Sequence, residues 1–172
     1  MARNVEIKAA VQSIEDLLER VIKLTDSPPE KLKQEDTFFN CENGRLKLRD
    51  FTDGTGELIF YNRSNTKGPK TCVYEIVPVE AVNSIRTVLS HAFGQLGRVR
   101  KHRTVYIVGR TRIHLDQVEE LGTYVELEVV LNEDESEDIG HREARELMAA
   151  LGIDDSSLLD CPYVDLLNER GT

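Results

Sequence analysis

Several features that would place this chain in a special class of protein are missing from its 172 residues. The three cysteines, Cys41, Cys72 and Cys161, are odd in number and lack metal-ligand spacing, so we expect reduced thiols and no disulfide framework. No apolar run approaches the roughly 20 residues that cross a bilayer, and the first residues lack the long apolar segment of a secretory signal. We therefore expect a cytoplasmic protein without a membrane partner.

Positive charge is also in deficit. The 22 lysines and arginines are outnumbered by 31 aspartates and glutamates, which gives a formal net charge of −9. A general nucleic-acid binder would show a basic excess, so nucleic acid is not an expected partner. Acidic residues gather at 132–138, whereas basic residues recur at every second position within strand-like segments. That contrast directs attention to the strands.

Hydrophobic periodicity predicts an α+β protein whose sheet is antiparallel. Strands are expected at about 3–11, 34–41, 44–50, 57–63, 71–78, 98–108, 111–117 and 122–131. Helices are expected at 12–24, 79–93 and 136–151, and residues 163–167 should add a final strand or turn. No linker or low-complexity segment interrupts the pattern, so residues 1–172 are predicted to form a single domain.

The predicted strands carry ionic side chains on one face and apolar side chains on the other. Glu6 and Lys8, for example, alternate with Val5 and Ile7. An ordinary half-exposed sheet would explain one such strand, but at least four share the pattern. A solvated face would also draw on threonine, serine and glutamine, which form strands better than glutamate or lysine. We therefore expect the helices to cover the outside of a curved sheet and the charges to face its concave side.

A closed barrel of about eight strands has room for side chains or one small ligand. The candidate cations for its interior are Lys8, Lys47, Arg49, Arg63, Lys101, Arg103 and Arg112. The candidate carboxylates are Glu6, Asp116, Glu126 and Glu128. Because buried charges need partners, the surplus of cations predicts a polyanion such as a polyphosphate. The clustered carboxylates predict a hard divalent cation, Mg²⁺ or Mn²⁺.

The order of these motifs resembles the CYTH superfamily, also called the triphosphate tunnel metalloenzymes, which includes class IV adenylyl cyclase and thiamine triphosphatase. Glu6-Ile7-Lys8 resembles the end of the family's Glu-x-Glu-x-Lys signature. The later motifs are Lys47-x-Arg49, Lys101-x-Arg103, Arg112-x-His114-x-Asp116 and Glu126-x-Glu128. Each motif is weak alone, but five in sequence, all on strands and in phase, cover the chain from Asn4 to about Leu167.

The resemblance implies an eight-stranded antiparallel barrel with flanking helices, formed around a tunnel that binds a triphosphate. It implies metal ligation by Glu6, Asp116, Glu126 and Glu128. It implies phosphate contacts from Lys8, Lys47, Arg49, Arg63, Lys101, Arg103 and Arg112. Glu6, Lys8, Glu126 and Glu128 are the expected catalytic residues. His114 is interpreted as a hydrogen-bonding wall residue in preference to a base.

Asn4 departs from the family pattern, because the first acidic residue of the signature is here a neutral amide. Its carbonyl oxygen can still ligate a hard cation but adds no charge, which puts two-metal chemistry in doubt. The leading hypothesis is a metal-dependent hydrolase acting on inorganic, nucleoside or thiamine triphosphate. The alternatives are a class IV-type adenylyl cyclase that makes cyclic AMP from ATP, and a non-catalytic triphosphate- or polyphosphate-binding module, which Asn4 favours.

Overall fold

The computed structural model describes residues 1–25 and 27–171. Its strands are β1 (Ala2–Ala10), β2 (Glu30–Phe39), β3 (Arg45–Asp50), β4 (Gly56–Arg63), β5 (Lys70–Val79), β6 (Gln95–Val108), β7 (Thr111–Val118) and β8 (Gly122–Leu131). Its helices are α1 (Ile14–Leu24), α2 (Val82–Phe93), α3 (Glu137–Leu151) and α4 (Tyr163–Arg170), with a 3₁₀ turn, η1, at Asp155–Ser157. None of these helices has the length and apolar composition needed to span a bilayer.

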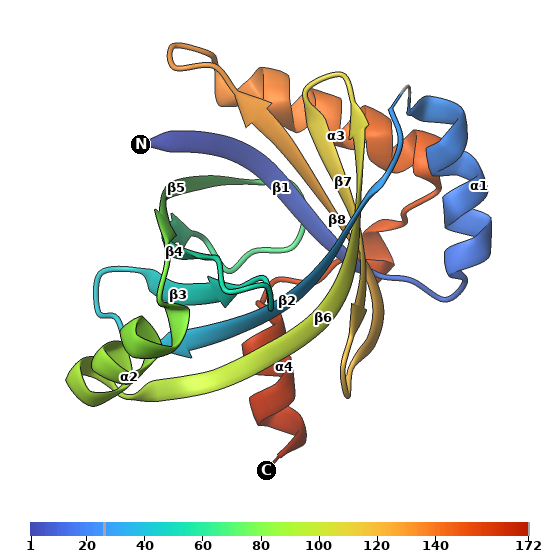
Figure 1. The fold of residues 1–172 in the computed structure, drawn as a ribbon. Coiled ribbons are helices and arrows are strands. Elements are labelled where there is room, and N and C mark those ends of the chain that lie inside the picture. The colour runs from blue at the N-terminus through green and yellow to red at the C-terminus, as the bar shows by residue number, and fades with distance from the viewer. Residues whose placement is uncertain (26, 172) are drawn as a thin grey trace.

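The eight strands form a closed antiparallel barrel in the order β1-β5-β4-β3-β2-β6-β7-β8 (Figure 1). Strands β2 to β5 follow one another as a meander, and β6 to β8 form a second meander. β1 closes the ring because it pairs with β5 along one edge and with β8 along the other. The predicted barrel is thus confirmed, since every strand of the described residues pairs with a neighbour on each side.

The alternation of β1 sorts its side chains between the barrel interior and the helices outside. Val5, Ile7 and Ala9 are almost completely buried and belong to the apolar clusters under the helices. Glu6 and Lys8, between them, face the inside of the barrel, where they line a cavity. The period of two therefore places an apolar layer outside and an ionic layer inside, as the sequence predicted.

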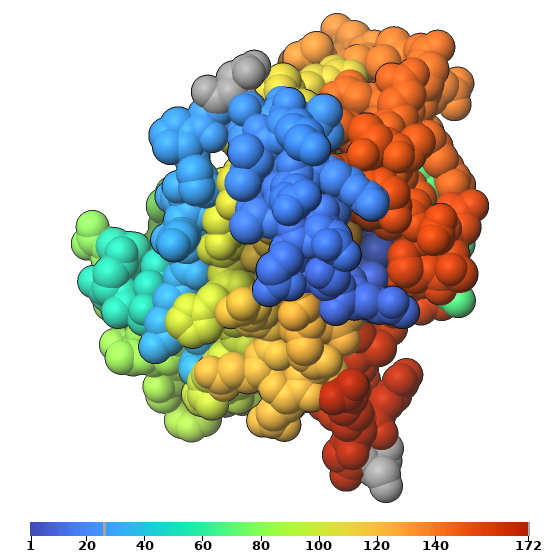
Figure 2. Space-filling model, turned by 90° about the vertical axis from the view of Figure 1, so that its right-hand side faces the viewer, coloured from blue at the N-terminus to red at the C-terminus, as the bar shows by residue number. Residues whose placement is uncertain are grey.

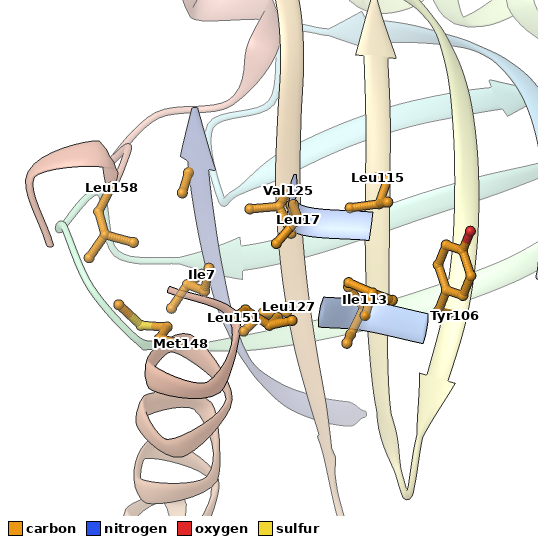
Figure 3. Packing of buried hydrophobic residues seen from close by; sticks show 12 residues of the cluster. Ile7, Leu17, Tyr106, Ile113, Leu115, Val125, Leu127, Met148, Leu151 and Leu158 are labelled. Carbon is orange, nitrogen blue, oxygen red and sulfur yellow. The ribbon is translucent and has the colours of Figure 1, made fainter. Parts of the chain in front are cut away.

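Helices α1 and α3 cover the barrel over β1, β7 and β8 and touch one another (Figures 1 and 2). Figure 3 shows Leu17 of α1 and Met148 and Leu151 of α3 among the side chains of the strands, including Ile7 and Leu127. Helix α3 approaches the strands closely at Gly140, where an added Cβ would lie 2.8 Å from side-chain atoms of Val5 and Leu131. The main apolar core therefore lies outside the barrel.

The ends of these two helices are fixed by local interactions. The hydroxyl of Ser13 accepts a hydrogen bond from the backbone N–H of Asp16, and that of Ser136 accepts one from Asp138. Helix α3 ends at Gly152, whose φ of 69° is the left-handed conformation that glycine adopts at least cost. Ser13 was predicted as a cap, and both helices begin within two residues of their expected positions.

The expected strand or turn at 163–167 is wrong, because Tyr163–Arg170 form helix α4. Tyr163 and Val164 are good strand formers, which made the short segment ambiguous. Pro162 precedes the helix at its N-cap, and Tyr163 and Val164 pack into an apolar cluster with Phe38 of β2 and Val99 of β6. Tertiary packing at one end of the barrel thus decides the conformation, and α4 projects away from that end (Figure 1).

We predict that Leu151→Ala lowers the free energy of unfolding by about 2–5 kcal/mol, because it removes a buried side chain between α3 and the barrel. Leu151 is 1% exposed, whereas Val88 on α2 is 65% exposed and supplies a matched control. Val88→Ala should change stability by less than about 0.5 kcal/mol in the same denaturant titration. Equal stability of the two variants would contradict this description of the core.

Candidate functional site: a charged cavity inside the barrel

The barrel encloses a cavity of about 390 Å³ to which all eight strands contribute side chains. All seven predicted cations line it: Lys8, Lys47, Arg49, Arg63, Lys101, Arg103 and Arg112. Of the four predicted carboxylates, Glu6, Glu126 and Glu128 line it, and Asp116 does not. The strands have thus brought together side chains that are more than 100 residues apart in sequence.

The charge of this cavity is more nearly balanced than the sequence predicted. Its lining contains six carboxylates, namely Glu6, Glu30, Asp36, Glu57, Glu126 and Glu128. The expected large surplus of cations over the whole cavity is therefore wrong, because three acidic residues of β2 and β4 also face inward. What the structure shows instead is an uneven distribution, with a cation-rich wall on β2, β3 and β6 and an acidic wall on β1 and β8.

Asp36, which sequence reasoning missed, is the centre of the cation-rich wall. It is 1% exposed, and its register on β2 places it opposite Arg49 on β3. Arg49 donates to both its carboxylate oxygens, each at 2.9 Å, and Lys47 donates to Oδ2 at 3.0 Å. Lys101 on β6 lies 3.8 Å from the same oxygen. One carboxylate thus serves three cations.

The electrostatics of Asp36 follow from that arrangement. Burial by itself would raise the pKa of Asp36, but Arg49, Lys47 and Lys101 outweigh it and hold the pKa well below 3.8. Burial lowers the pKa of Lys101 to about 7, and Arg103 acts in the same direction. The sequence signal for Asp36 was obscured because β2 carries acids in both phases, with Glu35 facing outward beside it.

Asp116 lies behind the cavity and holds Arg103 in place. Arg103 donates to its two oxygens at 2.7 and 2.6 Å, and the hydroxyl of Tyr163 donates to Oδ2 at 3.0 Å. Burial would raise the pKa of Asp116, but Arg103 and Lys101 lower it to about 2. With 0% exposure and both oxygens engaged, Asp116 is placed to orient Arg103 rather than to ligate a metal in the cavity.

The acidic wall pairs carboxylates across neighbouring strands. Glu6 on β1 stands opposite Glu128 on β8, a like-charged arrangement that costs free energy unless a cation offsets it. Burial raises the pKa of Glu6, and Glu128 and Glu126 raise it further, against the lowering effect of Arg63. Arg63 lies 2.8 Å from Glu6, so this carboxylate has one positive partner already.

Glu126 has a cationic neighbour on each of its oxygens, and Glu128 has one on a single oxygen. Lys8 lies 2.9 Å from Oε1 of Glu126, and Arg112 lies 2.8 Å from Oε2 of Glu128. Arg103 also pairs with Glu126 through Oε2. These carboxylates are held in fixed positions, and the second oxygen of Glu128 points toward His114.

His114, which was interpreted as a wall residue, lines the cavity beside two carboxylates. Its Nδ1 lies 3.6 Å from Glu126 and 3.8 Å from Glu128, and the three residues form a group that could hold a metal ion. Burial, together with Arg103, lowers the pKa of His114 below 6.5, so the imidazole is neutral at neutral pH. It shares the inward phase of Arg112, which was the available sequence signal.

Tyr163, at the start of α4, contacts the basic residues from one end of the barrel. The ammonium of Lys8 lies 3.6 Å from the centre of its ring and that of Lys101 lies 5.3 Å from it. Together with its hydrogen bond to Asp116, these contacts make Tyr163 part of the site. Sequence reasoning did not predict this role for Tyr163, because residues 163–167 were expected to form a strand or turn.

Residues 2–163 match the CYTH domain family model, so this chain belongs to the CYTH domain family. The sequence-based resemblance is confirmed. The chain is 26% identical to a Methanocaldococcus jannaschii protein that is named as a candidate adenylate cyclase, over 95% of this chain and 97% of that one.

Two solved structures illustrate the shared fold. A Pyrococcus horikoshii protein superposes with a TM-score of 0.84 at 18% identity, over 95% of this chain and 98% of that one. A Hippeastrum adenylyl cyclase candidate, described as having a dominant triphosphatase activity, superposes with a TM-score of 0.64 at 16% identity, over 94% and 91% of the two chains. The family thus includes proteins named for both activities.

We predict that Asp36→Asn lowers the free energy of unfolding by about 3–5 kcal/mol in phosphate-free buffer, because three buried cations lose a shared partner. Inorganic triphosphate should then raise the melting temperature of this variant more than that of the unmodified protein, since the anion supplies the missing charge. Glu57→Gln, at a half-buried carboxylate of the same cavity, is the control for thermal unfolding with and without triphosphate. Equal shifts in all three proteins would contradict the role given to Asp36.

Proposed function

We propose that this protein is a divalent-metal-dependent hydrolase that binds a triphosphate group inside the barrel and releases phosphate from it. The observation that carries the proposal is the separation of charge within one cavity. Lys47, Arg49 and Lys101 surround the single carboxylate of Asp36 on one wall, and Glu126 and Glu128 stand on the other. A triphosphate with a bound divalent cation offers acceptor oxygens to the first wall and a positive centre to the second.

The proposed phosphate contacts are the seven cations that line the cavity: Lys8, Lys47, Arg49, Arg63, Lys101, Arg103 and Arg112. Arginine can bind phosphate through two parallel hydrogen bonds, whereas lysine acts as a point charge. Arg103 is held in one orientation by Asp116, which removes part of the entropic cost of binding. Phosphoryl transfer depends mainly on such positioning and on stabilisation of charge on the phosphoryl oxygens.

Glu6, Glu126 and Glu128 are the proposed metal-binding carboxylates, and together with Lys8 they are the proposed catalytic residues. Their buried oxygens fit Mg²⁺ or Mn²⁺, and the opposed pair of Glu6 and Glu128 would be relieved by a cation. When bound, the cation neutralises and polarises the phosphoryl oxygens. Lys8, 2.9 Å from Glu126, is placed to bind a phosphate beside these carboxylates. Asp116 is left out of the proposed ligand set because it is 0% exposed and, unlike the three glutamates, does not line the cavity.

Cyclisation of ATP is the second candidate, and the name of the Methanocaldococcus jannaschii relative favours it. It requires the nucleoside to be held so that a ribose hydroxyl reaches the α-phosphate. Tyr61 and Tyr74 line the cavity on β4 and β5 and are two of the aromatic side chains there that could contact a base. The two reactions differ in products, since cyclisation of ATP releases pyrophosphate and hydrolysis at its terminal phosphate releases phosphate.

A third candidate, a binding module without turnover, is favoured by Asn4.

We predict metal-dependent phosphate release from at least one member of a panel of inorganic triphosphate, nucleoside triphosphates and thiamine triphosphate. Glu126→Gln and Glu128→Gln should each lower turnover by about 100-fold or more, the scale on which loss of one stabilising group acts. Glu146→Gln, at an exposed position of α3, is the control and should leave turnover unchanged. Cyclic AMP with pyrophosphate as the products would establish cyclisation instead, and tight binding without any product would establish a binding module.

We also predict that triphosphate binding near neutral pH takes up protons. With a pKa of about 7, Lys101 is largely neutral in the free protein at about pH 8, and a bound polyanion favours its charged form. The affinity should therefore fall as pH rises above about 7. Calorimetry in buffers of different ionisation enthalpy measures the number of protons taken up on binding. Lys101→Met lacks the titrating amine, so its proton uptake reports the contribution of the ligand itself. The same proton uptake in Lys101→Met and in the unmodified protein would exclude Lys101 as the source.

A further inference from the structure

Three side chains with metal-binding atoms meet on the cavity wall formed by β7 and β8. Nδ1 of His114 lies 3.6 Å from Oε2 of Glu126 and 3.8 Å from Oε1 of Glu128. These separations are too long for hydrogen bonds. Donor atoms that share one ion, each about 2 Å from it, lie roughly 3–4 Å from one another. The two separations from His114 are therefore those of ligands around a common ion, and all three donor atoms lie within 4.8 Å of one another.

Two buried polar atoms that face this cavity lack a hydrogen-bond partner among the described residues. His114 is 5% exposed, and its Nδ1 is unpartnered. Asn4 is 3% exposed, and its Oδ1 is unpartnered as well. A buried acceptor without a partner costs free energy, and a bound cation would satisfy it. Nδ1 of His114 belongs to the cluster itself, whereas Oδ1 of Asn4 is a separate buried acceptor that lines the same cavity and points to the same kind of ligand.

We propose that His114 is a nitrogen ligand of the metal site, together with Glu126 and Glu128, and that it gives the site a preference for Mn²⁺ over Mg²⁺. The inference rests on the proposed function for the metal-binding role of the two carboxylates. Mg²⁺ is bound in proteins almost entirely through oxygen, whereas imidazole binds transition-metal ions. Asn4 also favours Mn²⁺ over Mg²⁺. It replaces the acid of the signature with a neutral amide, which removes negative charge that would bind a hard cation.

The neighbouring charges leave Nδ1 of His114 and Oε1 of Glu128 available for such an ion, whereas both oxygens of Glu126 have a cationic partner. Lys8 engages Oε1 of Glu126, and Arg112 engages Oε2 of Glu128. Oε1 of Glu128, the oxygen nearer to His114, is on the opposite side of its carboxylate from the Arg112 contact. Arg103 shares Oε2 of Glu126 with the proposed site, so its guanidinium is the group that must adjust when an ion binds.

The test uses Mn²⁺ alone, without any phosphate compound. Pulsed electron paramagnetic resonance of the protein with one equivalent of Mn²⁺ should show the modulation of a directly bound ¹⁴N, and labelling histidine with ¹⁵N should change it. His114→Asn should abolish the nitrogen signal and lower Mn²⁺ affinity by at least about tenfold in calorimetry. Its Mg²⁺ affinity should change much less, because the amide oxygen replaces the donor with one that Mg²⁺ prefers.

The control replaces the other histidines, His91, His102 and His141, by asparagine in one variant, which should keep both the nitrogen signal and the Mn²⁺ affinity. If His114→Asn fails to fold, as judged by circular dichroism, the triple variant still tests whether His114 binds the ion. His114 is the one histidine that this variant retains, so a nitrogen signal from histidine must come from it. Loss of the signal in the triple variant, an oxygen-only signal in the unmodified protein, or an unchanged ratio of Mn²⁺ to Mg²⁺ affinity in folded His114→Asn would overturn the inference.

Failure of this inference and failure of the proposed function give different results. A nitrogen-coordinated Mn²⁺ in a protein that releases no phosphate and makes no cyclic AMP would contradict the hydrolase and support the metal site. Turnover of a triphosphate with Mn²⁺ bound through oxygen alone would support the hydrolase and contradict the role of His114. The two measurements are made on the same preparation of the full chain.

Discussion

Ionic side chains inside a closed barrel must find partners there, and most of the interior is arranged by that requirement. Asp36 holds Lys47 and Arg49 through direct ion pairs and has Lys101 at 3.8 Å, while Asp116 and Glu126 hold Arg103. A buried charge that loses its partner costs several kcal/mol, so these groups constrain one another across five strands. The main apolar core lies on the outside under α1 and α3, and a second apolar cluster, which includes Phe38 and Val99, lines part of the cavity.

The same pairing shapes what the cavity can bind. The cations already form ion pairs with carboxylates of the protein. An incoming anion must therefore compete with those carboxylates for the same cations. Lys47 and Arg49 share the carboxylate of Asp36 and so retain unsatisfied positive charge, while Lys101 lies 3.8 Å from Asp36 and 3.7 Å from Asp116. On the opposite wall the carboxylates lie close to one another and to a neutral imidazole. A polyanion carrying its own cation meets both conditions, whereas an uncharged ligand would leave the ion pairs of the cavity uncompensated.

Helix α4 connects the end of the fold to this interior. Tyr163 lies over Lys8 and near Lys101, and its hydroxyl donates to Asp116, so three charged groups of the barrel depend on the position of one aromatic ring. Its burial against Phe38 and Val99 fixes that position through apolar packing. The orientation of Arg103 by Asp116 is therefore supported by a helix that follows the last barrel strand by more than 30 residues.

The sequence alone determined the alternation of strands, the inward phase of the seven cations and of Glu6, Glu126 and Glu128, and the position of three helices, because periods of two and 3.6 residues are local properties. It could not determine which strand neighbours which. That register places Asp36 opposite Arg49, draws Asp116 behind Arg103, and brings His114 to Glu126 and Glu128. It also could not determine the helical state of Tyr163–Arg170, since packing overrides the weak propensity of so short a segment. Only closure of the barrel decided how the charges pair, because ion pairing depends on distances between strands that the chain leaves far apart.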